Sequence, residues 1–277
     1  MAIPDDAKDK AATTYNAAAD YYDTNSFWER FGRATVERLQ LPLGSRVLDV
    51  CCGSGASALP AAEMVGPQGF VLGIDLAANL LELARTKAAE RGLMNTQFRV
   101  GDLLDTRLSD TQFDAVICVF GIFFIPDMPA AVRALWHTVR PGGKLAVTTW
   151  GPRFLEPATT AFWNAVREVR PDLYKGFNPW DRISDPESVR TLLREGGIAR
   201  ADVVAEANTH PILSAGAWWS AVLGSGFRGT VDQLDAAALK HVYEANRSYI
   251  EGSGISSVET NVIYAIAQKQ SSNGARC

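Results

Sequence analysis

The stretch from Val47 to Asp75 is the sequence feature that most constrains the fold of this chain. An apolar run that contains Asp49 is followed by a tight turn of small residues, an alanine-rich segment and a second apolar run. This order predicts a β-strand, a turn that opens a helix, and a second β-strand, which is the βαβ unit that holds a nucleoside. Asp75 follows Gly55 by 20 residues. At about that distance an acid at the tip of the second strand can accept hydrogen bonds from ribose hydroxyls.

The sequence of the turn indicates which class of ligand such a unit can bind. A pyrophosphate needs the pattern G-x-G-x-x-G, which lets the backbone approach the phosphates at the helix N-terminus. Here the turn reads Cys51-Cys52-Gly53-Ser54-Gly55-Ala56-Ser57-Ala58, and Asp49 stands two residues before it. An acid at that place repels a pyrophosphate and suits a cationic ligand that carries an amino acid. S-adenosylmethionine (SAM) is such a ligand.

The stretch from Val47 to Gly55 resembles motif I of the class I SAM-dependent methyltransferases, especially the small-molecule branch that includes the ubiquinone/menaquinone-biosynthesis type. The family usually has glycine where Cys51 stands, so the local geometry of the turn departs from the pattern. The resemblance covers residues 46–150 well and the remainder only in general plan. It implies an α/β, Rossmann-like fold with a doubly wound, mostly parallel seven-stranded sheet and helical lid insertions.

A third acidic position follows the predicted third strand, in the sequence Gly101-Asp102-Leu103. In the resembled family an acid at this place accepts the adenine amino protons, and the next backbone amide meets the ring. The alternative is an aspartate that caps a turn, but its place after Asp49 and Asp75 favours adenine. The residues that the resemblance predicts at the cofactor are Asp49, Cys51, Gly53, Gly55, Asp75, Leu76, Asp102, Leu103, Val119 and Tyr22.

The remaining segments are predicted to cover this domain. Residues 46–268 form the SAM-binding domain, with lid insertions at about residues 151–184 and 208–256. Residues 1–45 form an N-terminal lid of two short amphipathic helices after a polar, frayed start over residues 1–12, and residues 269–277 form a polar tail. The aromatic residues of the N-terminal segment either fill the core or fold over the cofactor. In the second case Tyr22 or Trp28 would face the sulfonium through cation–π attraction.

The acceptor site is predicted to be apolar. The buried run Phe113 to Phe120 lacks the Asn-Pro-Pro-Tyr type motif of nucleobase-modifying relatives, which disfavours a polar pocket for an extruded base. Residues 170–183 form a long irregular segment, which is typical of a binding loop. The predicted acceptor-binding residues are Phe120, Phe123, Phe124, Trp150, Tyr174, Trp180, Trp218 and Trp219.

An acceptor that must lose a proton needs a base within reach. The candidates are His210, His241, Asp181 and Tyr174. His210 ranks first because it follows the predicted sixth strand, and with Tyr174 it is the predicted catalytic residue. A surface or capping role is the alternative for His210, and His137 is expected to be structural.

The composition disfavours several other classes of function. The net charge is −4 and the basic residues are scattered, which disfavours a nucleic-acid partner or an anionic membrane surface. No apolar run is fit for a signal peptide or a membrane span, so the cytoplasm is the expected compartment. The four cysteines have neither disulfide nor metal-ligand spacing, so no metal is expected. The chain is expected to be a monomer or a homodimer.

The sequence therefore predicts in-line methyl transfer from SAM to an apolar or aromatic small molecule. The accepting atom, oxygen, nitrogen or carbon, is left open. A catalytically idle SAM-binding accessory protein is one alternative. An NAD-dependent oxidoreductase is the other, and Asp49 together with the Gly-Asp-Leu element speaks against it.

Overall fold

The computed structural model describes residues 5–104 and 112–271, and one seven-stranded sheet organises them. The strands are β1 (Arg46–Val50), β2 (Phe70–Asp75), β3 (Thr96–Val100), β4 (Phe113–Val119), β5 (Val139–Trp150), β6 (Asp202–Glu206) and β9 (Val262–Gln268). Their order across the sheet is β3-β2-β1-β4-β5-β9-β6. Strand β9 runs antiparallel to both of its neighbours, and the other described pairings in this sheet are parallel. The predicted fold class is confirmed.

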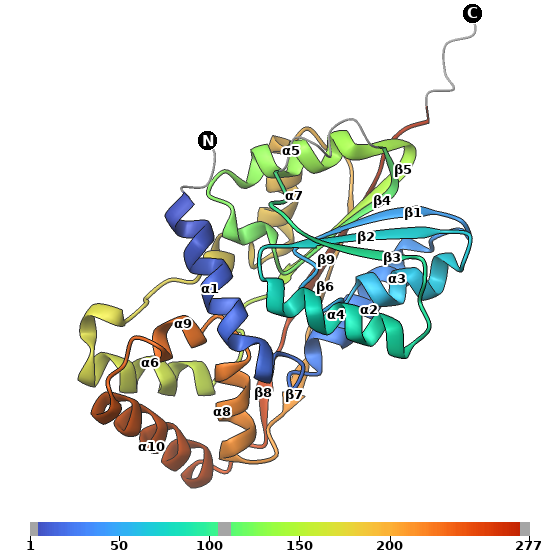
Figure 1. The fold of residues 1–277 in the computed structure, drawn as a ribbon. Coiled ribbons are helices and arrows are strands. Elements are labelled where there is room, and N and C mark those ends of the chain that lie inside the picture. The colour runs from blue at the N-terminus through green and yellow to red at the C-terminus, as the bar shows by residue number, and fades with distance from the viewer. Residues whose placement is uncertain (1–4, 105–111, 272–277) are drawn as a thin grey trace, which may run out of the picture.

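Helices cover both faces of the sheet, as a mostly parallel sheet with apolar strands requires. Helices α2 (Phe27–Leu39), α3 (Ala58–Val65) and α4 (Ala78–Glu90) lie on one face, and α5 (Met128–Thr138) and α7 (Pro186–Glu195) lie on the other (Figure 1). Small buried side chains on α3, namely Ala58, Ala61 and Ala62, allow this helix to lie close to the strands.

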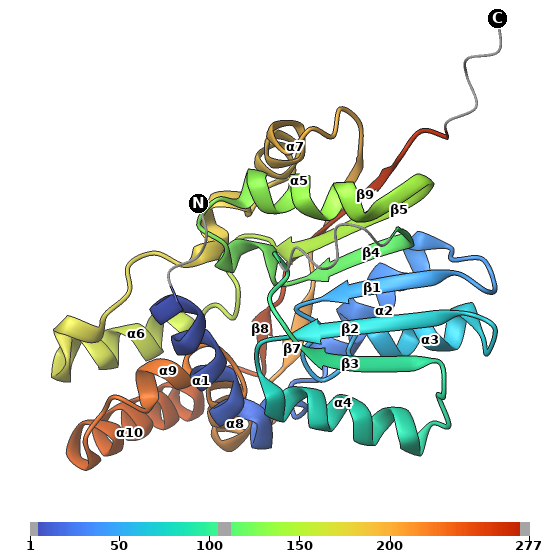
Figure 2. The same ribbon diagram turned by 45° about the horizontal axis from the view of Figure 1, so that its top comes forward.

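A second group of helices lies beyond the carboxyl ends of the parallel strands (Figure 2). It consists of α1 (Asp5–Tyr22), α6 (Ala158–Val169), α8 (Ala215–Leu223), α9 (Arg228–Val231) and α10 (Ala236–Gly252). Helix α1 packs against α4 of the sheet layer and against α8 and α9 of this group. The short 3-10 helices η2 (Ile122–Phe124), η3 (Pro171–Leu173) and η4 (Pro179–Ile183) complete the cover. Ligands bind at this edge in open α/β sheets.

No helix in the described part of the chain is both long enough and apolar enough to cross a bilayer.

Helix α1 is longer than the sequence predicts. It begins at Asp5, inside the stretch expected to be frayed, because packing against α4, α8 and α9 stabilises a helix whose own hydrophobic pattern is weak. The last predicted strand is also divided. Strand β8 (Ser257–Glu259) pairs with β7 (Thr209–Pro211) in a separate two-stranded sheet, and β9 starts only at Val262.

The division after β8 has a local cause. The side-chain amide of Asn261 donates to the Pro152 carbonyl oxygen, and its side-chain oxygen accepts from the backbone N–H of Asn208. These bonds hold the chain at the step between the two sheets. Residues 272–277 of the predicted polar tail lie outside the described residues.

Replacing Gly32 with alanine is expected to destabilise the fold. The added Cβ would lie 2.3 Å from the carbonyl oxygen of Ala56, so α2 would have to move away from the glycine-rich turn. Overpacking of this kind costs about 1–3 kcal/mol, and urea denaturation measures the loss in free energy of unfolding. Gly252→Ala is the control, because a new Cβ there meets no atom within 4 Å. Equal stability of the Gly32→Ala variant and the wild type would contradict this packing.

Candidate functional site

The glycine-rich turn after β1 has a left-handed backbone at three positions. The φ angles are 55° at Cys51, 53° at Gly53 and 87° at Gly55. Cys51 therefore adopts a conformation that favours glycine, which is the residue usual in the resembled family. Gly121 provides the space for its side chain, because a Cβ on Gly121 would lie 2.5 Å from Cys51 Cβ. The departure at Cys51 is thus accommodated by a glycine after β4.

Asp75 holds the turn and the second strand together. The backbone N–H of Gly53 donates to Oδ2 at 2.9 Å, and the backbone N–H of Ala77 donates to Oδ1 at 2.8 Å. Burial raises the pKa of this carboxyl, and the two backbone donors oppose the rise. A carboxylate has about four acceptor positions. Asp75 therefore has capacity left to accept hydroxyl groups from a ligand.

Asp49 lies beneath the turn and is fully buried. Its Oδ2 accepts a hydrogen bond from Ser57 Oγ at 2.8 Å, whereas its Oδ1 is buried without a partner. Burial raises the pKa of Asp49 to about 7. An unpartnered buried carboxylate oxygen is costly, and a cation or an N–H donor near it would relieve that cost.

A cavity opens at the carboxyl ends of β1 to β4, and the space among its lining residues is about 830 Å³, part of which is open to solvent. We call it the strand-end cavity. Seven of the predicted cofactor residues line it, namely Cys51, Asp75, Leu76, Asp102, Leu103, Val119 and Tyr22. The other three lie in or under the turn. Asp49 is below it, Gly53 is covered by the Tyr22 hydroxyl, and Gly55 packs on Leu59 and Ala84.

Helix α1 supplies lining residues that the sequence analysis missed. Lys8, Ala11, Ala12 and Tyr15 line the strand-end cavity together with Tyr22. Their helical spacing is the available signal, but Lys8, Ala11 and Ala12 lie in the stretch predicted to be frayed, whereas Tyr15 lies in a predicted helix. Lys8 Nζ lies 2.7 Å from Asp102 Oδ2, and the backbone N–H of Leu104 donates to Asp102 Oδ1 at 2.9 Å. The helix is thereby linked to the acid after β3.

Two aromatic side chains of the N-terminal segment face the turn. The rings of Tyr22 and Trp28 are stacked, with centroids 5.1 Å apart and planes 5° apart. The Tyr22 hydroxyl would lie 2.9 Å from a Cβ on Gly53, and Trp28 Nε1 is buried without a partner. Burial raises the pKa of Tyr22, so its phenol is neutral. Neutral aromatic rings at this place suit a cationic ligand.

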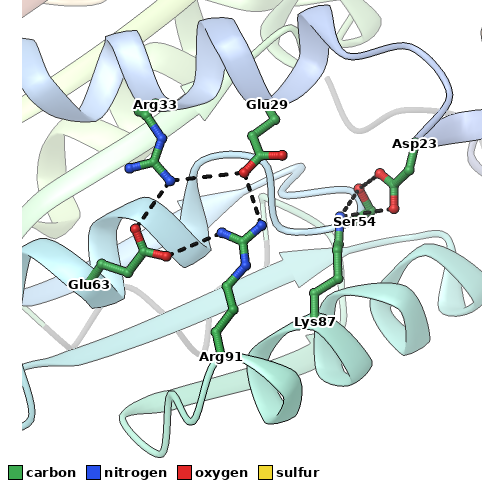
Figure 3. Close-up of polar contacts among 7 residues, drawn as sticks. All are labelled: Asp23, Glu29, Arg33, Ser54, Glu63, Lys87 and Arg91. Atoms are coloured by element: carbon green, nitrogen blue, oxygen red, sulfur yellow. Dashed lines mark hydrogen bonds and ion pairs between the residues drawn. The ribbon is translucent and has the colours of Figure 1, made fainter.

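Polar contacts hold the N-terminal segment against the turn and α4 (Figure 3). Asp23, in the link between α1 and α2, accepts from Ser54 Oγ at 2.5 Å and pairs with Lys87 Nζ at 2.9 Å. Nearby, Arg91 pairs with Glu29 of α2 and with Glu63 of α3, at 2.9 and 3.2 Å. The segment therefore stays close to the turn.

A second cavity adjoins the first, with about 620 Å³ of space that is partly open to solvent, and we call it the aromatic cavity. Tyr15, Trp28, Phe120 and Phe124 line both cavities and form a shared wall. Trp150 lies between Phe120 and Phe154, with ring centroids 3.6 and 3.9 Å apart. The other aromatic lining residues are Phe123, Trp163, Trp180 and Phe227.

Five of the predicted acceptor residues, Phe120, Phe123, Phe124, Trp150 and Trp180, line the aromatic cavity, and three do not. Tyr174 is half exposed, and its ring packs on that of Trp163, which itself lines the cavity. The indole N–H of Trp218 donates to Asn246 Oδ1 at 2.8 Å inside the helical group, and Trp219 packs on Tyr243. Helix α8 therefore turns both tryptophans toward α10.

The candidate bases lie outside the described lining of both cavities. His210 is on β7, half buried, with its ring 5.1 Å from that of Phe27, and burial lowers its pKa. His241 Nε2 contacts Glu168 Oε2 at 2.9 Å on the exposed side of the helical group. Asp181 accepts from the backbone N–H of Asn178. The described residues that line the aromatic cavity include no carboxylate and no imidazole.

Comparisons with known proteins assign the family. Residues 47–143 match the family described as "Methyltransferase domain". Aklanonic acid methyltransferase DauC from Streptomyces sp. (strain C5) is 34% identical over 200 residues, which cover 67% of this chain and 90% of DauC. The chain belongs to the class I SAM-dependent methyltransferases. SAM is its cofactor, and its substrates are small molecules.

Other known proteins are similar to this methyltransferase in part of the sequence or in the fold. Demethylmenaquinone methyltransferase from Listeria monocytogenes serotype 4a (strain HCC23) is 33% identical over 117 residues, which cover 42% of this chain and 49% of that protein. The chain thus matches about half the length of that relative. The crystal structure of YcgJ from Bacillus subtilis has a TM-score of 0.56 at 16% identity, with coverage of 87% of this chain and 99% of YcgJ. At this identity the likeness concerns the fold alone.

The residues of the strand-end cavity fit SAM. Asp75 and Asp102 offer carboxylate oxygens for hydroxyl and amino groups, and the unpartnered oxygen of Asp49 suits a nearby positive charge. The stacked rings of Tyr22 and Trp28 suit a sulfonium. These groups are of the kinds that the hydroxyl, amino and sulfonium groups of SAM require.

Asp75→Asn is expected to weaken cofactor binding by about 1.5–3 kcal/mol, the usual contribution of hydrogen bonds to a charged group. An amide oxygen can keep one of the two backbone N–H donors but not both, and it accepts ribose hydroxyls less strongly. Calorimetric titration with S-adenosylhomocysteine measures the change. Asp202→Asn, at an exposed position on β6, is the control. Unchanged affinity in the Asp75 variant would contradict the assigned role.

The buried Asp49 is expected to make stability depend on pH. Its pKa is about 7 when folded and 3.8 ordinarily, so between these pH values the unfolded chain has lost a proton that the folded chain keeps. Raising the pH from 3.8 to about 7 therefore favours unfolding, by up to about 1.4 kcal/mol per pH unit, and the effect levels off above that range.

The matched variant is Asp49→Asn, which cannot titrate. The difference in free energy of unfolding between this variant and the wild type is expected to grow with pH across that window. Urea denaturation at pH 5, 6 and 8 measures it. A difference that is constant with pH would show that Asp49 titrates near its ordinary value.

Proposed function

We propose that this methyltransferase transfers the methyl group of SAM to an aromatic small molecule bound in the aromatic cavity. The observation that carries the proposal is the shared wall of Tyr15, Trp28, Phe120 and Phe124. A donor in the strand-end cavity and an acceptor in the aromatic cavity would meet at this wall. Holding two reactants in line contributes roughly 7–11 kcal/mol to lowering the barrier.

The roles of the residues follow from their chemistry. When bound, SAM supplies a methyl group on a positively charged sulfur. Asp75 and Asp102 orient the nucleoside by accepting hydrogen bonds, and Asp49 favours positive charge near the turn. Tyr22 and Trp28 exclude water from the turn and offer their ring faces to a cation. The chain thus acts by orientation and by exclusion of water.

Proton removal is assigned to no histidine or carboxylate of the chain. The described lining of the aromatic cavity has none, and both His210 and Tyr174 lie outside it. Burial raises the pKa of Tyr15 well above its ordinary value, so its phenol acts as a neutral hydrogen-bonding group. We propose that the accepting group binds already ionised, or loses its proton to solvent.

The names of the relatives specify two different substrates, aklanonic acid for DauC and demethylmenaquinone for the Listeria enzyme. They therefore do not select an acceptor for this chain. The support for an aromatic acceptor is the lining itself, in which rings from the β4 and β5 ends, α6, η4 and the segment before α9 face one space. Aromatic pairs in offset or edge-to-face contact favour such a ligand.

We also propose that the protein works in the cytoplasm as a monomer or a homodimer. Cys51, Cys52 and Cys118 are free thiols, which is usual in a reducing compartment. Analytical ultracentrifugation distinguishes the two oligomeric states.

The test is a panel of aromatic and non-aromatic small molecules with a tritiated methyl donor. Trp180→Ala is expected to reduce methyl transfer to any acceptor that the wild type accepts, mainly through a higher KM, because its ring packs edge-on against Phe123 and Phe154 at the cavity wall. Trp219→Ala is the matched control, since it removes the same side chain outside the cavity. Both should bind S-adenosylhomocysteine like the wild type.

An equal KM for the Trp180→Ala and Trp219→Ala variants would show that the acceptor binds elsewhere. A panel of aromatic and non-aromatic small molecules in which the wild type methylates only the non-aromatic members would overturn the aromatic acceptor.

A further inference from the structure

One lysine stands among the aromatic residues of the aromatic cavity. Lys175 is the charged residue in its described lining, and it comes from the loop between η3 and η4. Its Nζ lies 5.7 Å from the centroid of the Trp163 ring. Because Lys175 both lines the cavity and is exposed to solvent, it lies at the opening.

The acids near this loop have other partners. Asp172 binds the guanidinium of Arg170, with contacts of 2.6 and 2.8 Å. Asp181 accepts from the backbone N–H of Asn178 at 2.7 Å. No acid in the described part of the chain pairs with Lys175, so its charge is not neutralised within that part of the protein.

A second lysine, from another segment of the chain, affects the pKa of Lys175. Lys10 lies on the exposed side of α1, and its positive charge, after the larger effect of burial, contributes to lowering the pKa of Lys175. Two segments that are distant in sequence therefore place like charges close enough to affect each other. Like charges near each other are unfavourable, and an anion bound at Lys175 would reduce the repulsion.

We propose that the acceptor is a flat aromatic molecule that carries a carboxylate, with its rings in the aromatic cavity and its carboxylate bound by Lys175. This inference rests on the proposed function and specifies its substrate class. The cavity walls supply ring contacts but no described cation other than Lys175. An ammonium at an apolar opening forms a charge-assisted hydrogen bond that is stronger than a neutral one.

The experiment compares two probes of nearly the same shape and size, the anion 2-naphthoate and its neutral amide, 2-naphthamide. Equilibrium dialysis with saturating S-adenosylhomocysteine measures the affinity of each. The wild type is expected to bind the carboxylate about tenfold more tightly than the amide. Lys175→Met keeps the apolar stem of the side chain and is expected to remove this preference. Lys175→Arg is expected to keep most of it.

Two further variants sharpen the result. Lys240→Met removes an exposed lysine on α10 that pairs with Glu244, and it is expected to leave the preference unchanged. Lys10→Met is expected to reduce the preference less than Lys175→Met does, because Lys10 does not line the cavity.

A wild type that binds both probes equally, or neither, would overturn the inference. So would a Lys175→Met variant that still prefers the carboxylate. Calorimetric titration with S-adenosylhomocysteine alone separates these failures from a failure of the proposed function. If S-adenosylhomocysteine binds normally but the carboxylate is not preferred, only the inference about the carboxylate is wrong. If S-adenosylhomocysteine does not bind, both the proposed function and this inference are wrong.

Discussion

The paired backbone hydrogen bonds to Asp75 are the interaction on which the rest of the site depends. The carboxylate accepts from Gly53 in the turn after β1 and from Ala77 at the start of α4. It therefore holds the ends of two neighbouring strands in one arrangement and keeps the turn in its left-handed conformation. The ionised form is costly in this buried place, and the backbone donors offset part of that cost.

Around this point two different chemical environments adjoin each other at the four shared aromatic residues. The strand-end cavity has carboxylates at the ends of β2 and β3, whereas the aromatic cavity has rings and one lysine. Phe120 belongs to the wall and has a φ of 54°, which is unusual for a residue with a side chain. Its ring is held in that position by stacking on Trp150. Local strain at the wall is thus offset by packing.

The N-terminal segment completes both cavities. Helix α2 is held by buried side chains such as Phe27, Phe31 and Leu39, whereas the contacts of α1 include partly exposed polar pairs such as Lys8 with Asp102. Exposed ion pairs contribute about 0–1 kcal/mol each. Tyr15, from α1, belongs to the shared wall. The shape of both cavities therefore depends on a helix whose polar contacts to the sheet are individually weak.

The sequence by itself determined the sheet, the glycine-rich turn and the acids at the strand ends. These features are local, since each acid follows its own apolar run and parallel strands end at the same edge. Only the tertiary structure decided which aromatic residues share a cavity. Trp180 lines it and Trp219 does not, because the side chains that a helix or loop turns toward a cavity depend on the elements packed around it. For example, the hydrogen bond from Trp218 to Asn246 holds the Trp218 side chain against α10. The same reason applies to α1. Its hydrophobic pattern is weak, so the segment is stable as a helix with a cavity-lining face only when other helices pack against it.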